Sequence, residues 1–365
     1  MADDKVRAMV VDDTVLYRRV LTEALESTGE AEVVATAPHG RLALARLEQI
    51  EVDLILLDVE MPELDGIGTL AEIRKRKNPP IVVMISGQTT RSARSTIHAL
   101  ENGALDFIRK PDSGDPEISR KELVDKLRPL VRHVQTRKNL RQVQTDEPPW
   151  TPRPTPPAAP QRATGRMADF VAVAIGVSTG GPNALGEMIP HLPGELPVPV
   201  LLVQHMPPGF TASLAEHLDR RSKIRVKEGV EGEAVNPGTV YIAPGGKHMV
   251  LRRMPEGGLI VGLNEQPPVN SCRPSVDVLF RSMAAQLDAP VLSVIMTGMG
   301  NDGCDGVRAL KRQSGYCLSQ TEKTCVVYGM PMAVDEAGLS DEQVPLDLLA
   351  SRVAQLVQKK VRHGS

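Results

Sequence analysis

A proline-rich segment near the middle of the chain divides the sequence into two parts. Residues 147–160 read EPPWTPRPTPPAAP, and seven of these fourteen residues are proline. Proline lacks a backbone N–H and fixes its own φ, so such a run is excluded from central strands and favours an extended conformation. We therefore predict an interdomain linker. Trp150, the single tryptophan, is expected to be exposed there or, alternatively, docked on a domain surface.

The length of the chain agrees with this division, because 365 residues suffice for two domains of roughly 150 residues. We assign residues 1–125 to a first domain, 126–166 to a basic helix and the linker, and 167–365 to a second domain. The basic segment, residues 120–144, holds eight basic and two acidic residues. Its apolar residues recur at helical spacing: Leu123, Leu127, Leu130, Val131 and Val134. A solvated helix that closes the first domain is favoured over a clamp onto that acidic domain.

Composition excludes several classes of protein. Hydrophobic residues make up 41% and charged residues 24%, as in ordinary globular proteins. The net charge of −2 argues against nucleic acid as a partner. No apolar run approaches the roughly 18 residues of a membrane helix, and MADDKVRAMVV lacks the apolar core of a signal peptide. We therefore expect no membrane insertion. The four cysteines show no CxxC spacing, so we expect reduced thiols in a cytoplasmic protein.

Both parts alternate continuous apolar runs with helical patterns, which is typical of a parallel sheet covered on both faces. One such helix, TVLYRRVLTEALEST, places Leu16, Val20, Leu21, Ala24 and Leu25 on one face. We predict the α/β class with two doubly wound parallel-sheet domains, which bind ligands at the carboxyl ends of strands. The strand candidates are Ala8–Val11, Leu54–Leu57, Ile81–Ile85, Leu105–Ile108, Val171–Ile175, Val200–Gln204, Thr239–Ile242 and Val291–Met296.

Polar residues stand at the ends of the first domain's strands. Asp12 and Asp13 follow the strand candidate Ala8–Val11, Asp58 follows Leu54–Leu57 and Ser86 follows Ile81–Ile85, and Lys110 comes soon after Leu105–Ile108. Converging carboxylates repel one another unless a hard cation joins them, and their oxygen atoms suit Mg²⁺. A carboxylate beside that ion, with a lysine and a hydroxyl opposite, is suited to accept a phosphoryl group.

The segments VVDDTVLYRRVL, LILLDVEMPELDG, MISGQ and GALDFIRKP resemble the flavodoxin-like receiver domain of bacterial two-component response regulators over about residues 5–125. The resemblance implies that Asp58 is the phosphoryl acceptor and that Lys110 contacts the phosphoryl oxygens. Ser86 is implied as the switch hydroxyl, and Phe107 stands at the switch aromatic, where only packing can act. The implied Mg²⁺ ligands are Asp12, Asp13, Asp58 and the backbone carbonyl of Glu60.

The second domain decides the output, and its mixed α/β pattern with little net charge argues against a DNA-binding module. A strand leads into Gly176-Val177-Ser178-Thr179-Gly180-Gly181, and a helix follows. This matches Gly-x-Ser-x-Gly, in which glycines allow a sharp turn that exposes the serine at a helix N-terminus. Ser178 is therefore a candidate nucleophile. A plain glycine-rich turn or a phosphate cradle is the alternative.

A serine nucleophile needs a base and an acid. His205 follows VLLVQ and lies at the same strand edge as Ser178, while His248 competes with it from beside the strand Met249–Leu251. The other histidines of the domain are His191 in a proline-rich loop, His217 on a helix face and His363 near the terminus. The candidate acids are Asp302 and Asp305 in VLSVIMTGMGNDGCDG and Asp277 in RPSVDVLF, and sequence position does not separate Asp302 from Asp305. The same glycines can expose N–H groups to an oxyanion, or form a flexible surface loop.

Six segments together resemble the Rossmann-like catalytic domain of the chemotaxis protein-glutamate methylesterase (CheB) family: AIGVSTGGPNAL, VLLVQHMPPGFTASLAEHLD, VYIAPGGKHM, CRPSVDVLF, IMTGMGNDGCDG and VVYGMPMAV. The resemblance implies Ser178 as nucleophile, His205 as general base and acid, and Asp302 as the orienting acid. Thr179 would assist the serine, and the Met299 N–H would belong to the oxyanion hole. Pocket shaping is implied for Arg273, Ser275 and Asp277.

This resemblance predicts phosphorylation-activated hydrolysis of glutamate methyl esters, and deamidation of specific glutamines, on methyl-accepting chemotaxis receptors. Mg²⁺ is expected for receiver phosphorylation and no cofactor for ester hydrolysis. The expected partners are those receptors and a chemotaxis histidine kinase as phosphodonor. A non-catalytic receptor-binding adaptor and a general hydrolase of small esters remain the alternatives.

Overall fold

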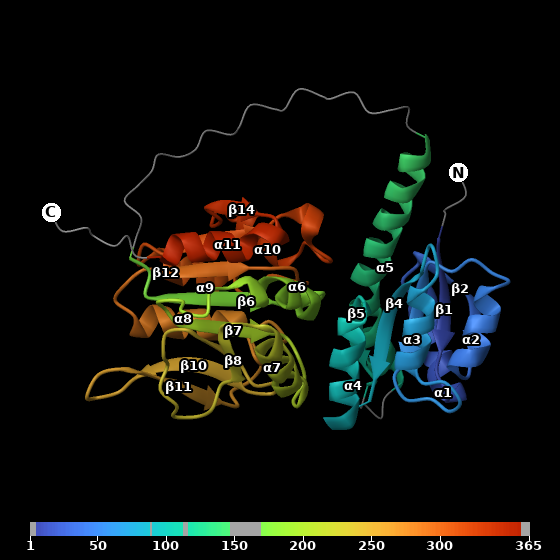
Figure 1. Cartoon of the computed structure of the whole chain (residues 1–365), viewed down its shortest axis with the longest axis horizontal. Coiled ribbons are helices and arrows are strands. Elements are labelled where there is room, and N and C mark those ends of the chain that lie inside the picture. The colour runs from blue at the N-terminus through green and yellow to red at the C-terminus, as the bar shows by residue number, and fades with distance from the viewer. Residues whose placement is uncertain (1–4, 88–89, 112–115, 147–168, 359–365) are drawn as a thin grey trace.

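The computed structural model describes residues 5–87, 90–111, 116–146 and 169–358 (Figure 1). The predicted proline-rich linker, with Trp150, and His363 lie outside these residues. Among the described residues, no helix is long and apolar enough to cross a membrane.

The first domain is a parallel five-stranded sheet with helices on both faces (Figure 1). Helices α1 (Val15–Glu26) and α5 (Pro116–Asp146) pack on one face. The opposite face carries α2 (Gly40–Leu47), α3 (Gly66–Arg74) and α4 (Thr90–Glu101). In the order β2-β1-β3-β4-β5, the strands are β1 (Val6–Val11), β2 (Ala31–Ala37), β3 (Leu54–Asp58), β4 (Ile81–Ser86) and β5 (Asp106–Arg109).

Helix α5 contains the predicted basic segment and closes the first domain. Its predicted apolar residues, Leu123, Leu127, Leu130, Val131 and Val134, are all buried in one cluster with α1 and β1. Cations on its rim also reach acids of the same domain, because Arg132 pairs with Glu30 and Lys138 with Asp53. The predicted boundary at residue 125 falls inside this helix.

The predicted face of α1 is correct except at its first turn. Leu21, Ala24 and Leu25 are buried, whereas the Leu16 side chain is 65% exposed. The buried face of α1 therefore excludes Leu16, although the sequence placed it on the same side of the helix. The first turn of α1 lies directly after Asp12 and Asp13, at the polar edge of the sheet and outside its apolar face.

The second domain is a parallel seven-stranded sheet in the order β14-β13-β12-β6-β7-β9-β8, with an antiparallel hairpin beside it. One face carries α6 (Gly181–Met188), α7 (Phe210–Arg221) and α11 (Leu346–Val357). The other carries α8 (Val276–Gln286), α9 (Cys304–Lys311) and α10 (Met330–Glu336). The strands are β6 (Ala172–Val177), β7 (Val200–Gln204), β8 (Arg225–Glu228), β9 (Thr239–Ile242), β12 (Val291–Ile295), β13 (Tyr316–Gln320) and β14 (Glu342–Val344), and the hairpin is β10 (His248–Arg253) with β11 (Leu259–Asn264).

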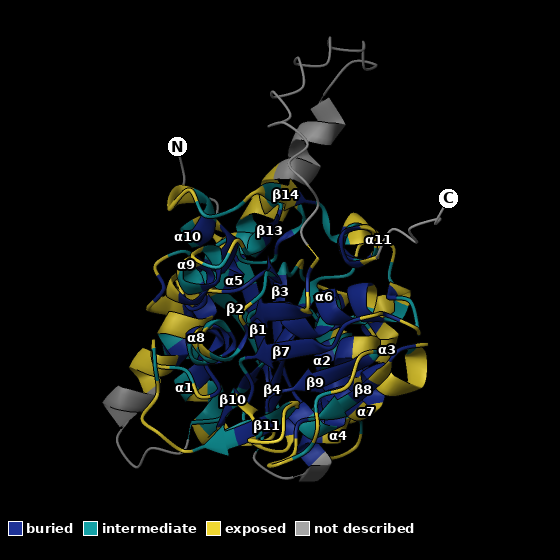
Figure 2. Ribbon diagram, turned by 90° about the vertical axis from the view of Figure 1, so that its left-hand side faces the viewer, coloured by how far each residue is buried: buried dark blue, intermediate teal, exposed yellow. Residues whose placement is uncertain are grey.

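The predicted α/β class with parallel sheets is confirmed. The central strands of both sheets are dark blue, hence buried, in Figure 2, and the eight predicted strands lie within one or two residues of the observed bounds. Strands β2, β8, β11, β13 and β14 were not predicted. Strand β8 reads RVKE and only its valine is buried, so it lacks the continuous apolar run of a central strand.

Candidate active site

Ser178, His205 and the loop that holds Asp302 follow three neighbouring strands, β6, β7 and β12. The chain leaves β6 toward β7 on one side and adds β12 on the other, so the site lies where the strand order reverses. Gly180 has a φ of +74°, and a Cβ on Gly181 would lie 1.9 Å from Gln204 Oε1. The turn that presents Ser178 therefore requires glycine at both positions.

His205 and Asp302 form the central pair of the site. His205 Nε2 lies 2.8 Å from Asp302 Oδ2. Asp302 is buried at the N-terminus of α8, where it accepts hydrogen bonds from the N–H groups of Val276 (2.7 Å) and Asp277 (3.2 Å). Ser275 Oγ (2.8 Å) and Asn270 Nδ2 (3.0 Å) donate to Oδ1 of the same carboxylate. The carboxylate is thus fixed in position.

The pKa values of His205 and Asp302 are shifted in opposite directions. Burial alone raises the Asp302 pKa, but the bond to His205, the imidazolium charge and the donors Asn270 and Val276 lower it to about 2. Burial lowers the His205 pKa, but hydrogen bonds with Asp302 and Cys272 and their charges raise it to about 9. The pair therefore favours an imidazolium beside a carboxylate at neutral pH.

Ser178 lies at the same sheet edge as His205 but makes no hydrogen bond with it. Among the residues that the structure describes, its hydroxyl has no hydrogen-bond partner, and Nδ1 of His205 faces Cys272 Sγ at 3.5 Å instead. Catalytic hydrogen bonds are often long before substrate binds, so this geometry leaves the serine a candidate. The predicted roles of the three residues stay predictions.

The remaining histidines are engaged elsewhere. His248 is fully buried, its Nδ1 accepts the Ser275 N–H (3.2 Å) and its Nε2 lies 3.2 Å from Pro267 O, so it has no ring nitrogen free for a base. His191 Nδ1 lies 2.6 Å from Glu187 O. His217 pairs with Glu101 of the first domain. Geometry therefore favours His205 as the base.

The contacts of the three candidate acids, Asp277, Asp302 and Asp305, also distinguish them. Asp305 is exposed and pairs with Arg308 and Arg281, away from His205. Asp277 Oδ1 accepts from the N–H groups of Gly303 (3.1 Å) and Gly306 (2.6 Å), which holds the loop around Asp302. Burial raises the Asp277 pKa. Ser275 and Asp277 thus position Asp302.

The other predicted support residues have distinct surroundings. Arg273 Nη1 donates to the carbonyls of Glu265 (2.9 Å) and Gln266 (3.2 Å), which ties two loops together. The Thr179 carbonyl accepts from Thr297 Oγ1 at 2.9 Å. Within the described part of the chain, nothing accepts a hydrogen bond from the Met299 N–H, and Met299 is 46% exposed.

Sequence reasoning missed two residues of the site, Cys272 and Asn270. Val269 and Cys272 exchange backbone hydrogen bonds, and the residues between them, Asn270 and Ser271, have φ values of +51° and +61°. Positive φ at both positions is typical of a type I′ turn. The turn places the Cys272 thiol against His205, and the asparagine in VNSC was the available signal.

The predicted phosphoryl site of the first domain is assembled at the ends of β1, β3 and β5. Ligand oxygens of Asp12, Asp13 and Asp58 lie within 4.8 Å of one another, and such a donor set fits Mg²⁺. Lys110 Nζ lies 2.7 Å from Asp12 Oδ2 and 2.8 Å from Asp58 Oδ2. Burial raises the Asp58 pKa, which Lys110 lowers in part. The Glu60 side chain accepts from Ser92 Oγ at 2.8 Å.

Of the two predicted switch residues, Ser86 bonds within the first domain and Phe107 contacts the second domain. Ser86 is buried, and its hydroxyl accepts from Thr96 Oγ1 of α4 at 2.8 Å. The Phe107 ring stacks on Phe210 at the start of α7, with 4.8 Å between ring centroids and 4° between planes. The aromatic residue at the switch position therefore packs directly against the other domain.

The domains also meet through polar groups close to Ser178. The N–H of Gly180 donates to Asp106 Oδ2 at 2.9 Å, and burial raises the Asp106 pKa to about 6. Asn183 Nδ2 donates to the carbonyls of Ala104 (2.8 Å) and Leu105 (3.1 Å). The first domain thus contacts the N-terminal turn of α6, which directly follows the serine turn.

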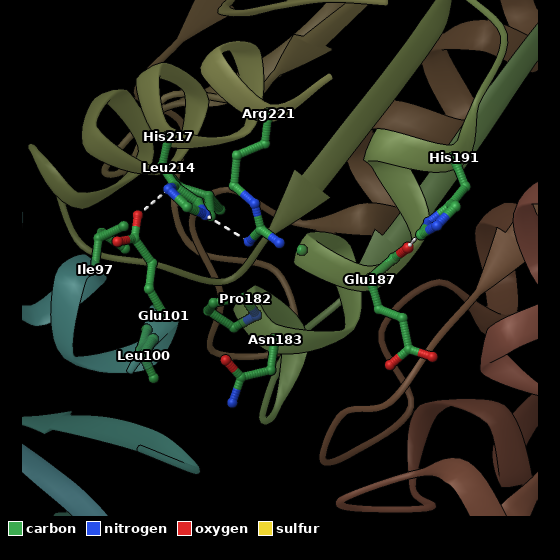
Figure 3. A pocket seen from close by; sticks show the side chains of 11 residues that line it. Ile97, Leu100, Glu101, Pro182, Asn183, Glu187, His191, Leu214, His217 and Arg221 are labelled. Carbon is green, nitrogen blue, oxygen red and sulfur yellow. Dashed lines mark hydrogen bonds and ion pairs between the residues drawn. The ribbon is translucent and has the colours of Figure 1, made fainter. Parts of the chain in front are cut away.

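A cavity of about 330 Å³ lies between α4 of the first domain and α6 and α7 of the second. Figure 3 shows the Glu101 carboxylate reaching His217, whose other ring nitrogen lies 3.2 Å from Arg221 Nη1. Burial lowers the His217 pKa, against the charge of Glu101. This chain of groups joins the two domains.

Known proteins match both domains. A family model described as CheB methylesterase matches residues 173–353, and one described as response regulator receiver domain matches residues 8–124. A relative from Desulfotalea psychrophila, named protein-glutamate methylesterase/protein-glutamine glutaminase, is 41% identical over 97% of this chain and 99% of its own length. A relative of the same name from Symbiobacterium thermophilum is 42% identical over 96% of this chain and 97% of its own.

Among solved structures, the Thermotoga maritima CheB methylesterase catalytic domain is 42% identical to the matching segment, with a TM-score of 0.50. It covers 52% of this chain and 99% of that one. The similarity to curated relatives extends through both domains and the segment between them.

Proposed function

Since the chain belongs to the protein-glutamate methylesterase/protein-glutamine glutaminase family, is thus a carboxylic ester hydrolase and carries a receiver domain, we propose that it hydrolyses glutamate methyl esters on methyl-accepting chemotaxis receptors in the cytoplasm, under phosphorylation control. The observation that carries the proposal is the His205–Asp302 pair, held beside the Ser178 turn at one sheet edge.

The proposed mechanism gives one role to each ring nitrogen of His205. Nε2 is bonded to Asp302, so only Nδ1 is left to take the Ser178 proton. The serine oxygen then attacks the γ-carbonyl carbon of the ester, and the tetrahedral oxyanion is stabilised by backbone donors, with the N–H of Met299 proposed among them. Thr179 is proposed to assist at the serine turn.

Collapse of this intermediate breaks the bond to the methoxy group, which leaves as methanol with the proton held by His205. Water, deprotonated by the same Nδ1, then attacks the acyl-enzyme and frees the glutamate carboxylate and the serine. The same sequence on a glutamine side chain releases ammonia in place of methanol. No cofactor is proposed for either reaction.

We propose that Asp58 accepts the phosphoryl group from a chemotaxis histidine kinase. Mg²⁺, held by Asp12, Asp13, Asp58 and the Glu60 carbonyl, would supply charge neutralisation in that transfer. Lys110 Nζ lies 2.8 Å from Asp58 Oδ2, which supports a role for it in contacting the phosphoryl oxygens. Ser86 would exchange its bond with Thr96 for one to the phosphoryl group.

Regulation follows from the same contacts. Asp106 of β5 accepts a hydrogen bond from the Gly180 N–H, and Phe107 stacks on Phe210. These contacts support the proposal that the receiver covers the serine side of the catalytic domain. We propose that phosphorylation of Asp58 shifts this interface and uncovers Ser178. Without phosphorylation the closed arrangement would limit receptor access.

Methanol release from methylated receptor membranes tests the proposal, with and without a small-molecule phosphodonor and Mg²⁺. Release that rises with the donor and is lost in Ser178→Ala supports both hydrolysis and its control. Full release by Ser178→Ala excludes Ser178 as nucleophile. If a phosphorylated chain binds receptors without releasing methanol, the adaptor function is correct instead. Hydrolysis of small esters only would favour the general esterase.

A further inference from the structure

The Cys272 thiol lies at the ring nitrogen of His205 that the proposed mechanism uses. Sγ is 3.5 Å from Nδ1, and Nε2 of the same ring is 2.8 Å from Asp302. The three ligand atoms lie within 4.8 Å of one another. A thiol, an imidazole and a carboxylate in this order form the arrangement in which an imidazole accepts a thiol proton and the sulfur becomes a nucleophile.

The position of this thiol is fixed by its turn. Cys272 N donates to Val269 O at 2.9 Å, and Val269 N donates to Cys272 O at 3.1 Å. Asn270, between them, donates from Nδ2 to both Asp277 (3.0 Å) and Asp302 (3.0 Å). The turn and the acid of the proposed triad are therefore one hydrogen-bonded unit, which holds the sulfur against the ring.

The other cysteines have different surroundings. Cys317 and Cys325 are buried, and burial raises the pKa of each to about 12. Cys304 is half-buried, its sulfur contacts the Ala333 carbonyl and Arg308, and burial raises its pKa. Among the residues that the structure describes, Cys272 is the one cysteine whose sulfur contacts an imidazole.

We propose that Cys272 is a modification site for hydroperoxides and small electrophiles, and that its modification blocks His205. The sulfur attacks one peroxide oxygen, so that an S–O bond forms and the O–O bond breaks. The thiol is oxidised to a sulfenic acid, and the peroxide is reduced. The thiol proton passes through Nδ1 of His205 to the leaving oxygen, which departs as water from hydrogen peroxide or as an alcohol from an organic hydroperoxide.

The consequence for hydrolysis rests on the proposed function. The new S–OH group occupies the space in front of Nδ1 and donates a hydrogen bond to it, so this nitrogen can no longer take the Ser178 proton. Methanol release is therefore expected to fall on oxidation and to return with a dithiol reductant, which restores the thiol. Alkylation at the same sulfur would block the base irreversibly.

Labelling of the full-length chain tests the site without any assay of activity. The unmodified protein is treated with limiting iodoacetamide, and each cysteine is quantified by peptide mass spectrometry. We expect Cys272 to be alkylated at least about tenfold faster than Cys304, and this preference to disappear in His205→Gln. Equal alkylation rates at Cys272 and Cys304 in the protein without substitutions would refute the proposal. This comparison does not depend on whether a variant folds.

Peroxide treatment in chelator-containing buffer then tests the effect on hydrolysis, with each variant normalised to its own untreated rate. The unmodified chain and Cys304→Ser should lose methanol release and regain it with dithiothreitol, whereas Cys272→Ser should keep its fraction of activity. Loss of the same fraction by Cys272→Ser would overturn the blocking role. Selective Cys272 labelling in a chain that releases no methanol would support the site while the proposed hydrolysis fails.

Discussion

At the scale of single residues, Asp302 determines how the base is held. Its carboxylate accepts hydrogen bonds from four donors besides His205, and an amide in its place would turn an N–H₂ group toward some of them. We expect Asp302→Asn to lower kcat for methanol release by about 10³–10⁴-fold, because the ring loses its fixed tautomer. Initial rates on methylated receptors measure this effect.

Asp305→Asn is the matched control, since Asp305 lies three residues away, is exposed and pairs only with surface arginines. Its rate should stay within about twofold of the unmodified chain, as exposed ion pairs contribute little. Equal losses in the two variants would show that the loop as a whole, and not the Asp302 carboxylate, is needed.

The pH dependence of the reaction follows from the raised His205 pKa. His205 acts as a base only when neutral, and its pKa of about 9 keeps it protonated near pH 7. The kcat/KM for hydrolysis should therefore rise from pH 7 toward pH 9. Asp302 and Cys272, which raise this pKa, belong to the second domain. The rise of kcat/KM between pH 7 and pH 9 should therefore persist after phosphorylation. A flat profile over this range would contradict the assignment of His205.

The same pair makes stability depend on pH at both ends. The folded pKa of His205 lies above its ordinary value of 6.5, so its contribution is complete below pH 6.5 and is lost as the pH rises through about 9. The Asp302 pKa lies below 3.8, so its contribution is present above that pH and is lost as the pH falls toward 2. Thermal unfolding of the unmodified chain and His205→Gln across pH 5–10 checks the upper limit, because the difference in Tm should shrink with rising pH.

Sequence reasoning reached Ser178 and His205 because each directly follows a buried strand, and neighbouring parallel strands end at one edge. It did not separate Asp302 from Asp305, because that choice depends on the N-terminus of α8, which is distant in sequence and supplies the Val276 and Asp277 N–H groups. Cys272 was missed for a related reason. Its thiol reaches His205 only through a turn between distant elements.

At the scale of elements, α5 combines a core face with a basic rim. Leu127 is fully buried on this helix, in the cluster shared with α1 and β1. We expect Leu127→Ala to lower the free energy of unfolding of the first domain by about 2–5 kcal/mol, as for other large-to-small core changes. Chemical denaturation measures the change, and the exposed neighbour Lys126→Ala should shift it by less than about 0.5 kcal/mol.

Prediction of elements succeeded where burial on both faces leaves a continuous apolar run. VLLVQ and TVYI were found with their observed bounds because they are central strands. Strands β8 and β14 lie at the two edges of the seven-stranded sheet, are short and carry polar residues, so their sequences lack that signal. Tertiary pairing alone makes them strands.

At the scale of the whole molecule, side chains of the receiver domain make specific contacts with the catalytic domain. The buried Asp106 carboxylate accepts the Gly180 N–H across the interface, and Phe107 beside it stacks on Phe210. None of these pairings was predicted from the sequence, because pairing between surfaces of separate domains leaves no periodic pattern. The proposed control by phosphorylation requires that these contacts hold the unphosphorylated state.

Two substitutions at Asp106 separate its hydrogen bond from its charge. Asp106→Ala leaves the Gly180 N–H without its acceptor, which opposes closure by about 1.5–3 kcal/mol, so methanol release without phosphodonor should rise by at least about tenfold. Asp106→Asn keeps an oxygen acceptor and removes a carboxylate whose burial is unfavourable, as its pKa of about 6 indicates. This variant should therefore stay closed, with unphosphorylated activity no higher than that of the unmodified chain.

The titration of Asp106 also determines how domain closure depends on pH. The Asp106 pKa is raised in the closed state above its ordinary value of 3.8, so deprotonation opposes closure increasingly between pH 3.8 and about 6. When the pH is lowered from 7 to 5, the chain without substitutions should close more tightly because Asp106 becomes protonated. Asp106→Asn lacks this carboxylate, so its closure should not change with pH for this reason. Small-angle scattering of both proteins without phosphodonor measures closure independently of His205. An equal response of the two proteins would show that Asp106 does not govern the interface.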